Sequence, residues 1–203
     1  MSRLPQDLET RLRAAAIGGI AFSIATTPQG VSSAWCELAD PKDLRPAAIA
    51  LRELGARLSM IVAGQPPAPE IEEEEAEKGE PQPQASPLPS NFGGTPIDGS
   101  SQEVVYHFDF DGDTASLLVF IAEGGALASL ADLFRPADWP EREIMETYNL
   151  TFTGHPDPRR LFLDESIDHA VLHRLIPLST LSNAASTKEL WAKVAAASQG
   201  NAK

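Results

Sequence analysis

The sequence predicts an α+β domain, in which helices cover a mixed β-sheet and a short helix-and-loop region follows. Its 203 residues are 42% hydrophobic and 22% charged, the balance of one globular domain that buries a core without disulfides. Local patterns run in the order helix, hairpin, helix, three strands. Because only one helix separates the hairpin from the later strands, most neighbouring strands are expected to be antiparallel.

Residues 1–63 form the first half of this domain and alternate between helical and extended patterns. Apolar residues recur every three or four positions in the helical stretches and occur in short apolar runs in the extended ones. Turn-forming glycines and prolines lie between these stretches. The expected elements are a helix over 6–16 ended by Gly18 and Gly19, a hairpin of strands over 20–26 and 31–38 around Thr27-Pro28-Gln29-Gly30, a helix ended by Gly55, and a strand over 58–63.

The second of these helices has two candidate starts. Pro41 and Pro46 both suit a first helical turn, where the missing N–H of proline costs no hydrogen bond. Its apolar side is expected to hold Ile49, Leu51 and Leu54.

Residues 64–100 are predicted to be a disordered insertion. Pro, Glu, Gly, Ser and Gln dominate this stretch, and it shows no apolar periodicity. Positions 70–80 hold seven Glu and one Lys, which is about half of the net charge of −13 of the chain. Such a segment cannot bury enough apolar surface to offset its loss of chain entropy. A solvated loop and an acidic docking segment are both open interpretations.

Residues 101–163 form the second half of the domain. Strands over 103–110 and 114–122 flank Asp111-Gly112-Asp113, and Asp-Gly between two apolar runs is a strong hairpin signal. The two strands complete the sheet.

Short helices are expected after this hairpin. Ser129 with Asp132, and Asp138 with Glu141, have the spacing of helix capping boxes. The further expected features are Pro140 in a first helical turn, a helix running to about Tyr148 with Asn149 as its left-handed stop, and a helical tail over 164–203 with helices over 165–175 and after Ser186.

Composition excludes several functional classes. No stretch approaches the roughly 20 apolar residues of a membrane-spanning helix. The single cysteine, Cys36, rules out an intrachain disulfide framework, and the acidic net charge disfavours nucleic acid. The first ten residues resemble no signal peptide. We therefore expect a cytoplasmic protein with no direct membrane insertion.

The sequence offers few candidates for a catalytic or cofactor motif. Cys36 has no basic neighbour in its strand pattern and is interpreted as a small buried hydrophobe. His169 and His173 share a helix face at a spacing that suits a metal, but no cysteine lies near them, and they are interpreted as part of a solvated helix face. His107 is interpreted as a structural histidine. No phosphate-binding glycine loop or nucleophile elbow is present.

A dense polar cluster is the remaining candidate site. One part places an arginine between two carboxylates on a helix, and the other is a loop stiffened by two prolines. Rigid display lowers the ordering cost of binding, so the cluster suits docking to another protein. The alternative is that Glu141, Arg142 and Arg160 only pair with each other. The candidate residues are Trp139, Glu141, Arg142, Glu143, Gly154, His155, Pro156, Asp157, Arg159 and Arg160.

Three segments together resemble the signature of a respiratory complex I family, that of the thirty-kilodalton subunit of NADH:quinone oxidoreductase. The same family supplies a subunit to energy-converting nickel–iron hydrogenases. The expected fold over residues 6–122 agrees with that of the family. The matching segments are Ser129-Leu130-Ala131-Asp132-Leu133-Phe134, Ala137-Asp138-Trp139-Pro140-Glu141-Arg142-Glu143 and Phe152-Thr153-Gly154-His155-Pro156-Asp157-Pro158-Arg159-Arg160-Leu161.

The resemblance implies a non-catalytic subunit of an oxidoreductase complex that holds no flavin, iron–sulfur cluster or quinone. It would pack, through the ten candidate residues, against the large subunit that forms the quinone or nickel–iron cavity. The small subunit with its cluster would lie beside it. The complex would hold the chain on the cytoplasmic face of the membrane.

Two segments depart from the family pattern. Glu146-Thr147-Tyr148-Asn149 replaces the usual Asp, aromatic and Gly at the end of the helix, and keeps a carboxylate and a residue compatible with a left-handed turn. The later His-Pro-Leu-Arg-Lys-Asp-Tyr-Pro motif is absent, and residues 171–178 lie where it is expected. This second departure from the pattern favours the hydrogenase branch of the family over the NADH-dependent complex. The alternatives from other classes are a free-standing protein that docks a basic partner through its acidic loop, and a metal-dependent hydrolase using His169 and His173.

Overall fold

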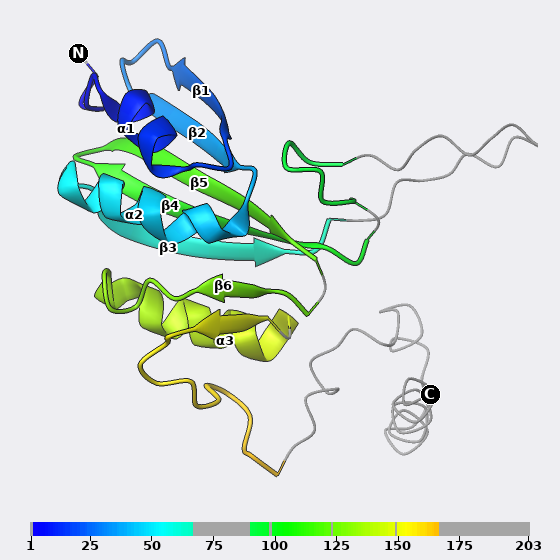
Figure 1. Ribbon diagram of the computed structural model, residues 1–203. Helices are drawn as coiled ribbons and strands as arrows, with labels where there is room; N and C mark the ends of the chain where they lie inside the picture. The colour runs from blue at the N-terminus through cyan, green and yellow to red at the C-terminus, as the bar shows by residue number, and fades with distance from the viewer. Residues whose placement is uncertain (1, 67–89, 98, 123, 149, 167–203) are drawn as a thin grey trace, which may run out of the picture.

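The computed structural model describes residues 2–66, 90–97, 99–122, 124–148 and 150–166. In this part of the chain, five strands form one mixed sheet and two short strands form a separate pair (Figure 1). The elements are α1 (Leu8–Ala15), β1 (Ile20–Thr26), β2 (Ser32–Leu38), the 3-10 turn η1 (Pro41–Asp43), α2 (Leu44–Glu53), β3 (Arg57–Gly64), β4 (Gln102–Phe110), β5 (Asp113–Ile121), β6 (Ala126–Ala128), the 3-10 turn η2 (Arg135–Ala137), α3 (Asp138–Tyr148) and β7 (Thr151–Thr153).

The five-stranded sheet has the order β1-β2-β5-β4-β3. Strands β2 and β5 are parallel, and the other three neighbouring pairs are antiparallel. The two expected hairpins are confirmed. Pro28 and Gly30, which has a φ of 83°, make the first turn, and Asp111 and Gly112, both with positive φ, make the second. The α+β class with a mixed sheet is therefore confirmed.

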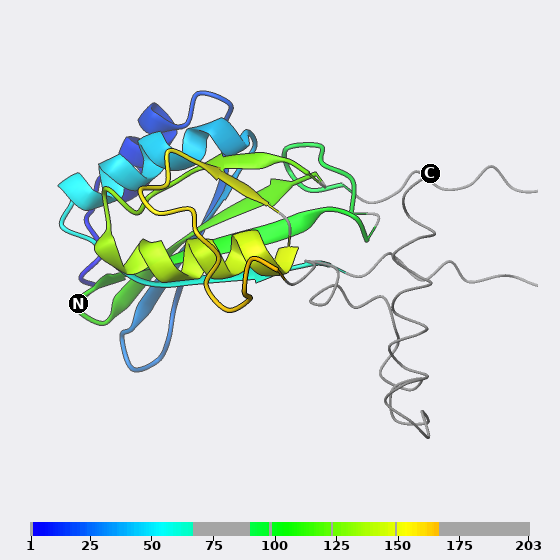
Figure 2. The ribbon, with the colours of Figure 1, turned by 90° about the horizontal axis from the view of Figure 1, so that it is seen from below.

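Helices α1 and α2 cover one face of the sheet (Figures 1 and 2). Alternate residues of β4, namely Val104, Tyr106 and Phe108, are fully buried, as the two-residue period of a half-covered strand requires. Helix α3 lies beside β3 with β6 and β7 next to it (Figure 2). The ring of Phe134 meets that of Phe108 edge-on at 5.3 Å between centroids, so this smaller unit shares the core of the sheet.

Both proline candidates for the second helix lie in its entry. Pro41 opens η1, where the Asp40 carboxylate accepts a hydrogen bond from the Lys42 N–H at 2.9 Å. Pro46 lies in the first turn of α2. The expected apolar side was wrong for Ile49, which is 38% exposed. Because the helix begins at Leu44, its buried stripe follows that residue at helical spacing: Leu44, Ala47, Ala48 and Leu51.

The first predicted capping box is wrong. Ser129 and Asp132 precede a turn, and the next element is the 3-10 turn η2. Ser129 instead follows β6, which pairs in parallel with β7. Neither of these three-residue strands was expected from the sequence. Asp132 pairs with Arg45 of α2 through both carboxylate oxygens, at 2.7 and 2.6 Å.

Several expectations fall on residues outside the described ranges. These are the stop at Asn149, the acidic run, and the helical tail with His169 and His173. Within the stretch assigned to the insertion, residues 90–97 form a turn closed by a bridge between Ser90 and Pro96. In the part of the chain that the structure describes, no helix is long and apolar enough to cross a membrane.

Replacing Phe134 by Ala should lower the free energy of unfolding by about 3–5 kcal/mol, because it opens a cavity where the small unit meets the sheet. Chemical denaturation measures this. The matched control is Phe162→Ala, where the ring is 63% exposed and the expected change is within about 0.5 kcal/mol. Equal losses from the two variants would show that Phe134 does not join the two units.

Candidate functional site

The polar cluster found in the sequence forms one compact unit around α3. The Trp139–Glu143 motif is the first half of α3, and the Gly154–Arg160 motif is a loop that follows β7 and returns along the helix. Gly154 has a φ of 79°, a conformation that a side chain would strain, where the chain leaves β7. We call α3 with residues 126–132 and 151–163 the α3 module.

Glu141 holds the segment before η2 onto α3. Its side chain is fully buried. One carboxylate oxygen accepts a hydrogen bond from the Ser129 hydroxyl at 2.5 Å, and the other accepts one from the Leu130 N–H at 2.7 Å. Burial raises the pKa of Glu141 to about 7, although these two bonds favour its charged form. Glu141 therefore caps a different segment from the one the capping-box pattern implied.

Glu146 holds the loop at residues 161–163 onto α3. Its carboxylate accepts three consecutive main-chain N–H groups, those of Leu161 at 3.1 Å, Phe162 at 2.9 Å and Leu163 at 2.7 Å. Hydrogen bonds to a carboxylate are stronger than those between neutral groups. This buried side chain fixes a stretch that has no regular secondary structure.

Arg142 is the third link between α3 and the loop. Its guanidinium donates hydrogen bonds to the main-chain carbonyls of Arg159 at 2.8 Å and Arg160 at 2.9 Å. It also lies 3.6 Å from the Asp157 carboxylate, and only 12% of its side chain is exposed. The guanidinium of Arg142 therefore binds the loop of its own chain, and little of it is exposed to solvent.

His155 ties the start of the loop to the start of α3. Its Nε2 donates to the carbonyl of Asp138 at 3.1 Å, and its Nδ1 accepts from the Asp157 N–H at 3.0 Å. This pattern assigns the neutral ring with its proton on Nε2. The Glu141 carboxylate lies 3.8 Å from the same nitrogen.

Two further buried oxygens lie at this end of the module. Among the described residues, the Tyr106 hydroxyl and Asp138 Oδ1 have no hydrogen-bond partner. Burial, and then the charge of Glu141, raise the pKa of Tyr106 well above its ordinary value. The tyrosine therefore stays neutral beside the glutamate.

The ten candidate residues thus divide into three groups. Glu141, Arg142 and His155 point inward and hold the module together. The alternative interpretation, that Glu141, Arg142 and Arg160 pair with each other, is wrong for Glu141 and Arg142, which bind different segments. The residues that lie exposed are Trp139, Glu143, Gly154, Pro156 and Arg159, while Asp157 and Arg160 are half-buried.

The outer surface of the module is aromatic and charged. Trp139 is 66% exposed and Phe162 63% exposed. Arg159 folds over Asp157 with two bonds of 2.6 Å, and this side-chain pairing holds the pKa of Asp157 well below its ordinary range. Sequence reasoning missed Phe162 and the role of Glu146. An apolar residue in a polar loop was the one available signal for Phe162.

The other chemical candidates are structural in the described residues. Burial raises the pKa of Cys36 to about 12, so its thiol is unreactive at neutral pH. His107 bonds the Ser116 hydroxyl at 2.8 Å, and burial lowers its pKa. Within the described ranges, no three His, Cys, Asp or Glu side chains come together as a metal site.

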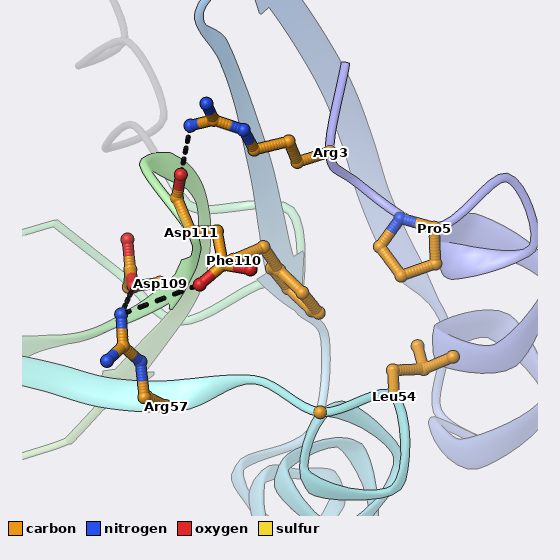
Figure 3. A pocket seen from close by; sticks show the side chains of 8 residues that line it. Arg3, Pro5, Leu54, Arg57, Asp109, Phe110 and Asp111 are labelled. Atoms are coloured by element: carbon orange, nitrogen blue, oxygen red, sulfur yellow. Dashed lines mark hydrogen bonds and ion pairs between the residues drawn. The ribbon is translucent and has the colours of Figure 1, made fainter. Parts of the chain in front are cut away.

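A polar depression of about 200 Å³ lies at the turn between β4 and β5 (Figure 3). Its charges are already matched. Arg57 pairs with Asp109, and Arg3 donates to the main-chain oxygen of Asp111. The pairing with Arg57 lowers the pKa of Asp109. This depression ties the N-terminal segment to the hairpin and leaves little net charge for a ligand.

Comparison with known proteins identifies relatives of this chain. A family model described as "Respiratory-chain NADH dehydrogenase, 30 Kd subunit" matches residues 39–184. That stretch includes the whole α3 module.

Curated relatives match over shorter stretches. The chain is 45% identical over 58 residues to the NADH-quinone oxidoreductase C subunit of Rhodopseudomonas palustris (strain BisB18), covering 29% of either protein. It is 49% identical over 51 residues to the NAD(P)H-quinone oxidoreductase J subunit of Prochlorococcus marinus (strain NATL1A), covering 24% of this chain and 30% of that one. The matches thus span about three tenths of these relatives. A solved structure of the trypsin-resistant fragment 1–134 of Nqo5 aligns with a TM-score of 0.47 and 20% identity, over 75% of this chain and 99% of that one.

The buried carboxyl of Glu141 makes stability depend on pH. Its pKa lies near 7 in the folded chain and at 4.5 ordinarily, so the folded state binds the proton more tightly and is favoured as pH falls below 7. Between pH 8 and pH 5 the wild type should therefore gain about 2.5 kcal/mol relative to Glu141→Gln, which cannot titrate.

Chemical denaturation of both proteins at several pH values measures the difference. Taking it against the Gln variant cancels the contributions of His107 and other groups common to both proteins. A difference that stays constant from pH 5 to pH 8 would contradict the raised pKa.

Replacing Glu146 by Ala should release the loop at residues 161–163 and leave the sheet intact. Amide hydrogen exchange at these three positions should become about 10- to 100-fold faster, because each N–H loses a charge-assisted bond. Glu143→Ala, an exposed glutamate of the same helix, is the control and should leave the three rates unchanged. Unchanged rates in the Glu146 variant would mean that another contact holds the loop.

Proposed function

This chain belongs to the family of the 30 kDa subunit of respiratory-chain NADH dehydrogenase, and on that premise we propose that it is a non-catalytic subunit of an NADH–quinone oxidoreductase. Its relatives are named as subunits of such enzymes. The proposed role is positional. The chain braces the large subunit that forms the electron-accepting cavity, beside the small iron–sulfur subunit, and so keeps donor and acceptor in register.

The construction of the α3 module is the observation that carries this proposal. The side chains of Glu141, Arg142 and Glu146 form hydrogen bonds to main-chain groups of the same chain. The result is a loop held in place at several points, so little chain entropy is lost when another protein binds it. Its outer surface then offers Trp139, Phe162 and Arg159, residue types enriched in protein interfaces.

In this proposal the subunit has no redox group of its own. An iron–sulfur cluster is usually held by four cysteine thiolates, and the sequence contains one cysteine, which is buried and keeps its proton. Electron transfer would take place entirely in neighbouring subunits. The chain would be held at the cytoplasmic face of the membrane through them.

The test is association with the complex in native membranes. A tagged version of the chain replaces the untagged protein in the cell that produces it. Membranes are then extracted in mild detergent, and the tag is detected on a native gel. The wild type should run in a large assembly. Because Trp139 and Arg159 are proposed as the exposed anchors, the double variant Trp139→Ala, Arg159→Ala should reduce the assembled fraction about tenfold or more, with its thermal unfolding unchanged.

Ile49→Ala, an exposed apolar residue on α2, is the matched control and should assemble normally. The purified assembly should show NADH-dependent quinone reduction. Nickel with hydrogen-dependent dye reduction would assign the chain instead to the hydrogenase branch that the sequence resemblance includes. A wild-type chain that runs as a monomer would overturn the proposal.

A further inference from the structure

The hairpin of β1 and β2 is unusual in this acidic chain because it has no charged side chains in its outer strand. No Asp, Glu, Lys, Arg or His occurs between Arg13 and Glu37, although 22% of all residues are charged. Strand β1 lies entirely within this stretch and is an edge of the sheet (Figure 1). Natural proteins usually protect such edges with charges, prolines or bulges. Strand β1 has none of these between Ile20 and Thr26.

The register of the hairpin shows which main-chain groups of β1 point outward. The Thr27 N–H donates to the Val31 carbonyl at 2.8 Å, and the Ala39 N–H donates to the Gly19 carbonyl at 3.1 Å. Residues of β1 with odd numbers therefore bond β2, and those with even numbers turn their N–H and C=O groups away from it. Arg13 occupies the outward carbonyl of Ile20. The outward groups beyond it belong to Phe22, Ile24 and Thr26.

The side chains beside this edge leave room for a neighbouring strand. Ile24 lies on the same face of the sheet as the buried Ile20, but it is 54% exposed. On the opposite face, β1 presents only small residues, Ala21 and Ser23. They line a groove of about 200 Å³ together with Phe22, Trp35, Glu37 and Leu118.

The chemistry of this groove selects a basic side chain. Glu37 is its single charged lining residue, and the half-exposed Trp35 indole lines the groove with it. One Glu37 oxygen already accepts a hydrogen bond from the Phe92 N–H at 2.7 Å, which does not neutralise the charge of the carboxylate. A carboxylate next to an indole suits a guanidinium or ammonium group, through an ion pair and a cation–π contact. A strand added to β1 would lie about 10 Å from β2, a distance that a long side chain spans over the small residues of β1.

We propose that β1 binds an extended segment of another protein, which adds a sixth strand to the sheet and places an Arg or Lys side chain in the groove between Trp35 and Glu37. The main-chain groups of Phe22, Ile24 and Thr26 provide the hydrogen bonds, and the groove provides the specificity, as in other strand-addition complexes. This surface lies at the opposite edge of the sheet from the α3 module, so the proposal does not depend on the function proposed above.

A second copy of this chain fits the edge less well. Pairing β1 with β1 of another copy would satisfy the main chain, but on the face of the groove β1 carries only Ala21, Ser23 and Ala25, which are too short to reach Trp35 and Glu37. The groove would stay unfilled. A partner strand with a basic residue uses both features.

Amide hydrogen exchange of the full chain tests the proposal, with a blocked peptide of alternating Thr and Val around one central Arg as the probe. In the free chain the amides of Phe22, Ile24 and Thr26 should exchange fast, and those of Ser23 and Ala25 slowly. Peptide at roughly millimolar concentration should slow the three outward amides about tenfold or more. The same peptide with Ala in place of Arg should need about a tenfold higher concentration, because it loses the groove contact.

Two variants at one position separate the main chain from the side chain. Ile24→Pro deletes an outward N–H and should abolish protection by the peptide, while Ile24→Ala keeps that N–H and should retain it. Slow exchange at Ser23 and Ala25 in both variants confirms that the hairpin is intact.

Three results would overturn the proposal. The first is no protection by the Arg peptide. The second is protection of the outward amides in the free chain that rises with protein concentration, which assigns the edge to a second copy. The third is protection of the outward amides in the free chain that does not change with protein concentration, which assigns the edge to another segment of this chain.

Discussion

Two carboxylates on one helix determine the shape of the candidate site. Glu141 and Glu146 lie buried on α3, and each accepts main-chain N–H groups from a different segment. Burying a carboxylate is costly unless hydrogen bonds compensate it. Here the compensation comes from irregular chain that otherwise lacks partners for its amides. The buried position of each glutamate therefore depends on the segment that it binds, and the conformation of that segment depends on the glutamate.

This dependence separates folding from recognition within one motif. The charged residues that make the motif conspicuous in the sequence, Glu141, Arg142 and His155, are largely enclosed. The residues exposed to the proposed partner are less conspicuous, above all Trp139 and Phe162. Their positions are set by the enclosed group, since the N–H of Phe162 is one of the three that Glu146 binds. A change at a glutamate would therefore reach a partner indirectly, through the placement of the aromatic rings.

The sequence predicted what is set by neighbouring residues and missed what is set across the chain. Both hairpins were found because proline, glycine and Asp-Gly specify their turns locally. The capping box at Ser129 was wrong because the partner of its hydroxyl is Glu141, on another element. Strands β6 and β7 pair over three residues each, too few for a periodic pattern. The inward role of Glu146 depends on amides fifteen or more residues away, which no local pattern encodes.

The sheet also separates two surfaces of opposite character. The α3 module packs beside β3, at one edge, and uses charge to order its own chain. Strand β1, at the other edge, lies in a stretch without charge and turns the main-chain groups of every second residue away from β2. Four strand spacings, about 19 Å, lie between the two edges. Because the strands between them are paired and packed into one core, the distance between the edges is nearly rigid. A chain built in this way suits a subunit that touches two neighbours at once, since neither contact obstructs the other and the sheet holds both at a constant separation.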